Sequence, residues 1–151
     1  ASNSLLEGIV YADRAAQRSL ERLSTAIPPF PQIAPWDTGN AEDSSEEVVV
    51  AHNWDEIRLC MCNYVGIVRT TKRLVRALRR VQMIQEEIAD YYWDFHITSD
   101  LIELRNIATV SELIIRSALE RCESRGLHYT LDYPERDDVH WKKDTLLRKD
   151  F

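Results

Sequence analysis

The sequence is poor in glycine. Among 151 residues there are four, each far from the next: Gly8, Gly39, Gly66 and Gly126. A phosphate-binding loop or a G-x-G-x-x-G turn needs several glycines within one short segment. The sequence therefore contains no independent nucleotide-binding motif. Because turn-rich β proteins also need more glycine, the shortage favours helices.

An excess of positive charge is also missing. There are 19 Lys and Arg against 25 Asp and Glu, so the net charge is -6. Binding to nucleic acid or to an anionic membrane needs a basic surface, and we expect neither partner. No apolar run reaches the roughly 18 residues of a membrane-spanning helix, and no signal peptide is visible. Three sparse cysteines favour a reduced, cytoplasmic protein.

Helical periodicity is what the sequence does contain. Apolar residues recur at three- and four-residue spacings through residues 4–26, which predicts a first helix. Four prolines then exclude helix: Pro28, Pro29, Pro31 and Pro35. We therefore expect an extended linker over residues 27–47, whose second half is acidic and solvated.

A heptad stripe marks the clearest element. Its members are Ile67, Leu74, Val81, Ile88 and Phe95, and they predict one long helix packed against other helices. A short helix over 54–64 precedes it, and 48–50 is either a short strand or the start of that helix. A turn at 96–100 leads to a third helix over 101–125, with Gly126 as the residue after its end.

The predicted fold class is all-α. Residues 1–26 form a separate helix and 27–47 a Pro-rich, acidic linker. Residues 48–126 form a three-helix up-and-down bundle. Residues 127–151 form an irregular tail with a helical turn near 141–147.

One run of cations and one pair of cysteines could each indicate a functional site, but each also has an ordinary structural explanation. Six cations without an acid lie at the start of the long helix: Arg69, Lys72, Arg73, Arg76, Arg79 and Arg80. They indicate either a surface for an anionic partner or a solvated face paired with neighbouring elements. Cys60 and Cys62 lack a second ligand pair, so we predict packed thiols and no metal site.

His128 is the most suggestive single residue. It follows a helix end and lies near Arg125 and Asp132 in the sequence. A hydrogen-bonded cluster that anchors the tail is the favoured interpretation, and a functional role is the alternative. No Ser is marked as a nucleophile. The chain is therefore predicted to hold no complete active site and no catalytic residue.

Four segments carry a family resemblance. They are Ala1-Ser2-Asn3-Ser4-Leu5-Leu6-Glu7, the run Asn63-Tyr64-Val65-Gly66-Ile67-Val68-Arg69-Thr70-Thr71-Lys72-Arg73-Leu74, Leu104-Arg105-Asn106, and Glu123-Ser124-Arg125-Gly126-Leu127-His128-Tyr129-Thr130-Leu131-Asp132-Tyr133-Pro134. They resemble the C-terminal part of the succinate dehydrogenase/fumarate reductase flavoprotein superfamily, and most closely its L-aspartate oxidase family. Cys60 and Cys62 depart from the bulky aromatics expected there.

The resemblance implies FAD-dependent oxidation of L-aspartate to iminoaspartate. Electrons would pass to O2 or fumarate, and the product would enter NAD biosynthesis through quinolinate. Ser4 and Leu5 match family positions whose backbone approaches the flavin. The physics agrees, because a helix N-terminus offers free N–H groups and a partial positive charge.

The same resemblance implies that the catalytic residues and the FAD-binding domain lie upstream. The chain alone is then expected to be inactive and structural, with its basic helix face against that domain. The apolar face of helix 1–26 would pack on the bundle or on a second chain by self-association. Two alternatives remain: a succinate dehydrogenase or fumarate reductase fragment, and a free-standing helical interaction module.

Overall fold

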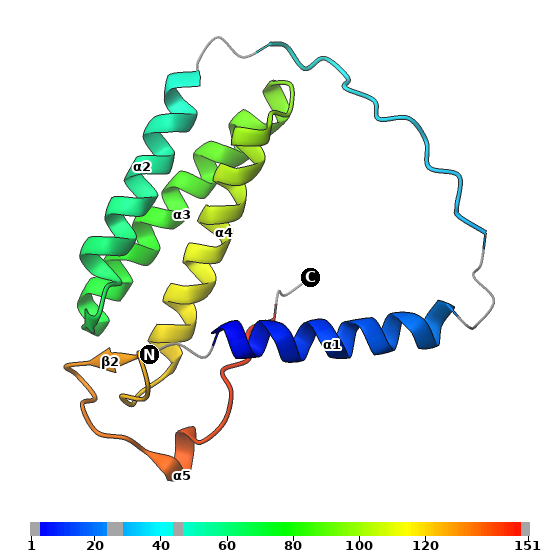
Figure 1. The fold of residues 1–151 in the computed structure, drawn as a ribbon. Helices are drawn as coiled ribbons and strands as arrows, with labels where there is room; N and C mark the ends of the chain where they lie inside the picture. The colour runs from blue at the N-terminus through cyan, green and yellow to red at the C-terminus, as the bar shows by residue number, and fades with distance from the viewer. Residues whose placement is uncertain (1–3, 24–28, 44–46, 149–151) are drawn as a thin grey trace. The chain divides into compact units, whose positions relative to one another are not determined.

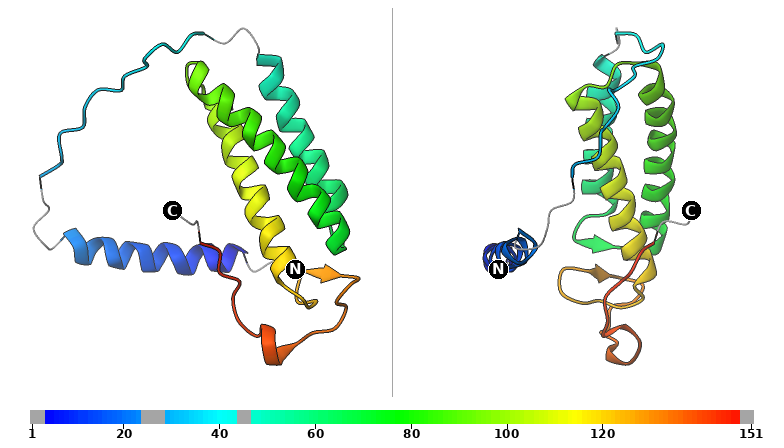
Figure 2. Two further views of the ribbon diagram at one scale, coloured as in Figure 1. Left: turned by 180° about the vertical axis from the view of Figure 1, so that it is seen from behind. Right: turned by 90° about the vertical axis from the view of Figure 1, so that its right-hand side faces the viewer.

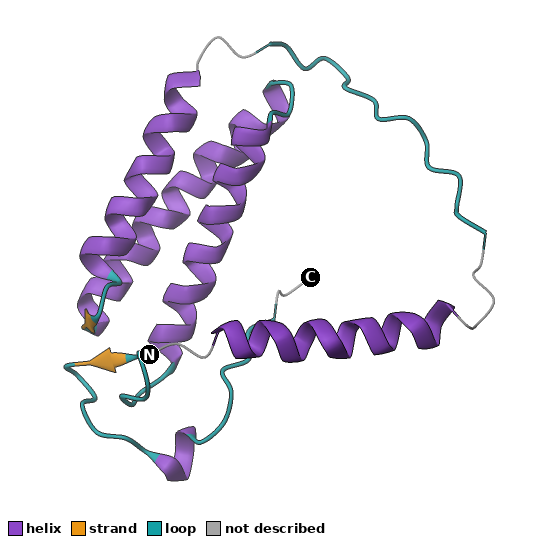
Figure 3. Ribbon diagram, in the orientation of Figure 1, coloured by secondary structure: helices purple, strands orange, loops and turns teal. Residues whose placement is uncertain are grey.

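The computed structural model describes residues 4–23, 29–43 and 47–148, and its elements are drawn in Figure 1. The chain divides into two compact units, Ala1–Asp37 and Thr38–Phe151. Figure 3 shows that helix is the main element of both. Among the described residues the strands are Val68–Arg69 and Tyr129–Thr130.

The first unit holds helix α1, Ser4–Leu23, which begins and runs as the periodicity predicts. None of its residues is buried. Its predicted last turn, residues 24–26, and Pro28 lie outside the described residues. Residues 29–37 have neither helix nor strand, as expected of a segment that contains three further prolines.

The second unit is built on three helices: α2 (Glu47–Tyr64), α3 (Thr71–Asp94) and α4 (Ser99–Glu120). They run alternately up and down beside one another, as both views of Figure 2 show. This arrangement confirms the predicted three-helix bundle. Their contact faces form the core, whose largest fully buried apolar side chains are Ile57, Leu74, Val81, Ile84, Leu101, Leu104 and Ile115.

The predicted stripe is correct in its middle and wrong at both ends. Leu74, Val81 and Ile88 are buried in the core. Ile67 precedes α3 and is 83% exposed, while Phe95 is the C-cap residue of α3. The helix begins later than predicted because Thr70 adopts an extended conformation and its hydroxyl accepts the Arg73 N–H at 3.3 Å, which makes it an N-cap.

Other helix boundaries also differ from the prediction. Helix α2 begins at Glu47, so residues 48–50 belong to a helix and not to a strand. Helix α4 ends at Glu120, with Arg121 as its C-cap. Gly126 is therefore not the residue after that helix. Its positive φ of 60° instead serves a tight turn, in which Arg125 and His128 exchange two backbone hydrogen bonds.

The tail is more ordered than expected. Strand β2, Tyr129–Thr130, pairs in parallel with β1, Val68–Arg69. Helix α5, Asp138–Trp141, comes three residues before the predicted helical turn. In the described part of the chain, none of the helices combines the length and apolar character needed to cross a membrane.

The end of the linker is fixed to the bundle by its backbone. The Glu42 N–H donates to the Asp94 carbonyl at 3.2 Å, and the His96 N–H donates to the Glu42 carbonyl at 2.8 Å. Asp43 also contacts the His96 ring, with Oδ1 2.8 Å from Nδ1. The predicted solvated acidic segment is thus attached at the turn between α3 and α4.

Candidate functional site

Ser4 and Leu5 form the start of α1. Both are exposed, and Leu5 shows 85% of its surface. The first N–H groups of a helix have no partner within the helix and carry a partial positive charge. The structure thus places Ser4 and Leu5 at the exposed start of a helix.

Helix α1 carries an uncovered apolar face. Its large apolar residues are all exposed: Leu5, Leu6, Ile9, Val10, Tyr11, Leu20 and Leu23. Most recur at three- and four-residue spacings, so they lie on one side of the helix. Exposed apolar surface of this extent marks a contact with another domain or chain.

The densest polar cluster follows the end of α4 and centres on Glu123. This carboxylate is fully buried. Its Oε1 accepts from Arg121 Nη1 at 2.5 Å and from Arg125 Nε at 2.7 Å. Its Oε2 accepts from Arg125 Nη2 and from the Asp137 backbone N–H, both at 2.9 Å. The Glu123 side chain thereby joins the helix end to the tail.

The surroundings of Glu123 lower its pKa to about 2. The bidentate hydrogen bond from Arg125 is the largest cause, and it outweighs the cost of burying the charge; bonds from Asp137 N–H and Arg121 add to it. The negative form is thus the one that the cluster binds. Glu123 is ionised at neutral pH and is not available to exchange a proton.

Arg121 extends the cluster toward the end of the tail. Its Nη1 donates to the Trp141 carbonyl at 2.9 Å and its Nη2 to the Lys143 carbonyl at 2.5 Å. Its Nε donates to the Thr145 hydroxyl at 3.2 Å. A single guanidinium therefore holds three tail residues against the end of α4. It can do so because a guanidinium presents several N–H donors in a rigid plane.

His128 has both ring nitrogens engaged. Nδ1 lies 2.9 Å from Arg69 Nη1, and Nε2 lies 3.2 Å from the Arg121 carbonyl oxygen. A guanidinium can only donate and a carbonyl can only accept, so the ring is the neutral tautomer with its proton on Nε2. Burial, with help from the charges of Arg69 and Arg121, lowers the pKa of His128.

Asp132 caps a helix that lies 61 residues earlier in the sequence. Its Oδ2 accepts the backbone N–H of Thr71 at 2.6 Å, and Thr71 is the first residue of α3. That bond and one from the Thr71 side chain lower the pKa of Asp132. The loop is tied internally by Ser124, which accepts from Thr130 N–H at 3.0 Å and donates to the Tyr133 carbonyl at 2.8 Å.

The predicted tail-anchoring role of His128 is therefore present, with partners that the sequence did not indicate. Asp132, which is near His128 in the sequence, caps α3. Arg121 and Glu123 were missed altogether. One signal could have found them: Arg121, Glu123 and Arg125 alternate just after a helix end, and in extended backbone such residues share one side.

The cysteines and the six cations are the remaining candidate groups of the sequence. All three cysteines are free, with Cys60 buried and Cys62 exposed. Burial raises the pKa of Cys60. Within the described ranges no group of three or more His, Cys, Asp or Glu side chains could hold a metal ion.

Of the six cations, Arg69 binds His128, Arg80 pairs with Glu56, and Arg76 lies 5.9 Å from the Tyr64 ring centroid.

Comparison with known protein families gives one match over most of the chain. The family described as "Fumarate reductase flavoprotein C-term" matches residues 54–151. That range holds most of the bundle and the whole cluster around Glu123.

Several curated relatives are L-aspartate oxidases. The chain is 55% identical to that of Pseudomonas aeruginosa over 148 residues and 57% identical to that of Yersinia pestis over 147 residues. Each match covers 97% of this chain and 27% of the relative. The chain thus spans about a quarter of the length of these relatives.

Solved structures with a similar fold come from related complexes. A variant of E. coli quinol fumarate reductase FrdA has a TM-score of 0.54 at 26% identity, covering 85% of this chain and 21% of that one. Mycobacterium smegmatis Sdh1 in complex with UQ1 has a TM-score of 0.52 at 28% identity, covering 82% of this chain and 19% of that one.

Proposed function

The chain belongs to the family of fumarate reductase flavoprotein C-terminal regions, and on that premise we propose that it completes an FAD-dependent L-aspartate oxidase. The proposal rests on a difference in sequence identity between two groups of related proteins. The chain is 55% and 57% identical to two L-aspartate oxidases across 97% of its length. Its identity to the two fumarate reductase and Sdh1 structures is 26% and 28%.

The complete protein would oxidise L-aspartate to iminoaspartate and pass the electrons to O2 or fumarate. Its product would supply quinolinate formation in NAD biosynthesis, in the cytoplasm. FAD supplies the electron-accepting chemistry when bound. The part described here contributes architecture, because Glu123 is locked in its ionised form and both nitrogens of His128 are occupied.

The residues at the start of α1 suit a flavin. Ser4 and Leu5 are exposed at a helix N-terminus, where N–H groups can donate to the electron-rich side of the ring system. The apolar face of α1 would be covered by the FAD-binding domain of the same polypeptide. In the isolated chain it would instead drive self-association.

Substrate choice tests the proposal. The complete protein, loaded with FAD, is offered L-aspartate or succinate, with O2 or fumarate as acceptor, and hydrogen peroxide and succinate formation are followed. We expect turnover of L-aspartate only. Faster oxidation of succinate would instead support a succinate dehydrogenase or fumarate reductase. The 151-residue chain with FAD and L-aspartate should yield no peroxide, and turnover by that chain would contradict its structural role.

The flavin contact has its own test. Ser4 is the first residue of α1, a position where proline is well tolerated, so Ser4→Pro removes one N–H donor and keeps the helix. We expect Ser4→Pro to weaken FAD binding to the complete protein by about tenfold, which corresponds to the loss of one hydrogen bond. Ser4→Ala keeps the N–H and should bind FAD normally. Equal FAD affinity of both variants would exclude the contact.

A further inference from the structure

Helix α3 carries opposite charges on its two halves. The first half has five cations: Lys72, Arg73, Arg76, Arg79 and Arg80. The second half has four acids: Glu86, Glu87, Asp90 and Asp94. All nine residues are exposed. Met83 stands between the two groups, near the midpoint of the helix, and is 40% exposed.

The cations and the acids lie at matching sequence distances on opposite sides of Met83. Four pairs each place a cation and an acid at equal sequence distance from Met83: Lys72 and Asp94 at eleven residues, Arg76 and Asp90 at seven, Arg79 and Glu87 at four, and Arg80 and Glu86 at three. Arg73 is the one cation whose counterpart, Trp93, is not an acid. With the exception of Arg73, each cation on one side of Met83 thus has an acid at the same sequence distance on the other side.

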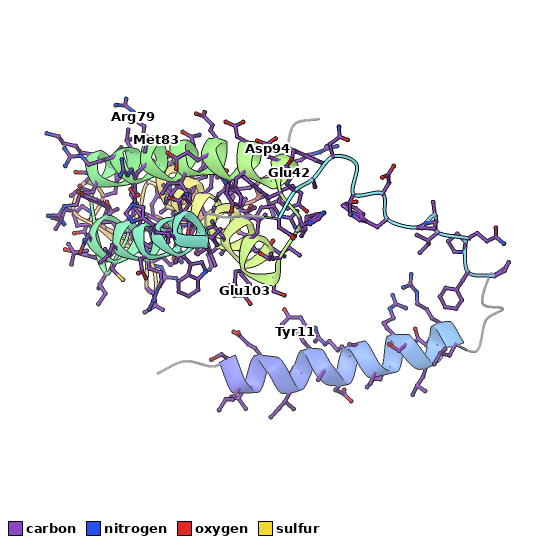
Figure 4. All side chains as sticks on the ribbon, turned by 90° about the horizontal axis from the view of Figure 1, so that it is seen from above. Tyr11, Glu42, Arg79, Met83, Asp94 and Glu103 are labelled. Carbon is purple, nitrogen blue, oxygen red and sulfur yellow. The ribbon has the colours of Figure 1, made fainter. Side chains whose placement is uncertain are left out.

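Most of these residues lie on one line along the helix. At 3.6 residues per turn, positions 72, 76, 79, 87, 90 and 94 all point within roughly 40° of Met83. Counting Met83, successive members are three or four residues apart, as along a seam between paired helices. We call these six residues and Met83 the α3 stripe. Figure 4 shows Arg79 and Met83 on one side of the helix and Asp94 at its far end.

The centre of the stripe borders a groove between α2 and α3. Leu59, Tyr64, Val75 and Met83 line it together with Lys72, Arg76, Arg79 and Arg80. Leu59 is 62% exposed, so the groove offers apolar contact at its middle. Contacts with α2 involve three of the charged side chains: Arg80 pairs with Glu56, Glu87 Oε2 accepts from Asn53 Nδ2 at 3.4 Å, and Arg76 lies 5.9 Å from the Tyr64 ring centroid.

We propose that the α3 stripe is the interface of a two-fold symmetric dimer, in which α3 of a second copy packs antiparallel across Met83. A two-fold axis through Met83 brings each position opposite its mirror position in the partner. Lys72 then faces Asp94 of the other copy, Arg76 faces Asp90, and Arg79 faces Glu87. Each pair occurs twice, and the apolar Met83 side chains meet at the axis.

A second copy fits the stripe better than another kind of partner. A parallel pairing would oppose like charges along the whole helix. A partner of one charge sign, such as an acidic helix, would match the first half and repel the second. Only a surface with the inverse charge order satisfies both halves, and the antiparallel copy has that order by symmetry.

Such a dimer is held by exposed ion pairs around a small apolar centre. Exposed pairs are individually weak and are screened by salt. We therefore expect association at micromolar concentration in low salt and dissociation as ionic strength rises. The FAD-dependent activity proposed above does not depend on this interface.

Complementary charge reversal tests the geometry. In the complete protein, Arg76→Glu sets two carboxylates against each other at both symmetric positions, and Asp90→Arg sets two guanidinium groups against each other. Sedimentation velocity in low salt should show each variant to be at least about tenfold weaker in self-association. An equimolar mixture of the two variants should form a heterodimer, because the introduced carboxylate of one copy then faces the introduced guanidinium of the other. The double variant should recover the homodimer.

The controls separate this dimer from other causes. Lys142→Glu makes the same change in net charge outside the stripe and should associate like the unaltered protein. Circular dichroism establishes that each variant is folded. A complete protein that stays monomeric in low salt overturns the proposal, as does a dimer unaffected by Arg76→Glu or a mixture that fails to pair. If Arg76→Glu instead weakens FAD binding with no change in sedimentation, the cations face the FAD-binding domain and the dimer is wrong.

Discussion

Arg69 and His128 are 59 residues apart in the sequence, yet Arg69 Nη1 lies 2.9 Å from His128 Nδ1. Arg69 is the last residue of β1 and His128 directly precedes β2, so in this parallel register the contact runs diagonally across the strand pair. Through its other nitrogen His128 reaches the C-cap residue of α4. One neutral imidazole thus connects the segment before α3, the end of α4 and the tail.

The state of His128 gives the first prediction. Because Arg69 donates to Nδ1, NMR should find the ring in its neutral form with the proton on Nε2 and a pKa below the usual 6.5. Arg69→Gln removes one of the positive charges that lower this pKa, so the pKa should rise toward 6.5 while burial continues to hold it down. A histidine that titrates above 6.5 in the unaltered chain would contradict the contact.

Glu123 should be essential for the stability of the tail. Glu123→Gln keeps the size of the side chain but leaves two arginines beside a neutral amide in a buried position. Removing one partner of a buried ion pair is strongly destabilising, and we expect the melting temperature to fall by at least about 5 °C. Glu120→Gln is the matched control, because Glu120 is exposed at the end of α4. Equal melting temperatures for both variants would show that the cluster is not stabilising.

The low pKa of Glu123 predicts a specific dependence on acid. The pKa falls from 4.5 to about 2 on folding, so the stabilisation is complete above pH 4.5 and is lost as pH falls through 2. The difference in unfolding free energy between the unaltered chain and Glu123→Gln should therefore be constant above about pH 5.5. It should shrink between pH 4.5 and 2. Urea titrations across this range measure it, and a difference independent of pH would refute the lowered pKa.

Thr70 should set the start of α3. Its hydroxyl accepts the Arg73 N–H, and loss of such a cap typically costs about 1 kcal/mol. Thr70→Ala should lower the free energy of unfolding by about that amount, whereas Thr70→Ser keeps the acceptor and should change it little. If the two variants unfold alike, Asp132, which accepts the Thr71 N–H, is sufficient to cap the helix by itself.

The bundle was predictable because its core follows helical periodicity. Leu74, Val81 and Ile88 repeat every seven residues and are all buried. The same rule failed at Ile67 and Phe95, because periodicity continues through a sequence without regard to where a cap ends the helix. Thr70, which directly follows β1, is in extended conformation and stops the helix from reaching Ile67.

The candidate site was predictable in its location and not in its contacts. His128 stood out because it follows a helix end, and the family resemblance covered the segment around it. Glu123 did not stand out, since a carboxylate between two arginines is usually a solvated surface group. Burial makes it different, and burial arises only when the tail folds back over the end of α4 and Asp137 supplies its backbone N–H.

The sequence by itself determined the helical class, the three bundle helices, the separate first helix and the family, because apolar spacing and local motifs act over short stretches of chain. It also determined the mirrored charges of α3, which are a property of residue order. Only the tertiary structure decided which polar groups lose water and which remain exposed. Arg69 and His128 meet, Asp132 caps α3, and Glu123 is held ionised, because distant segments come together and a buried charge must then find its partners.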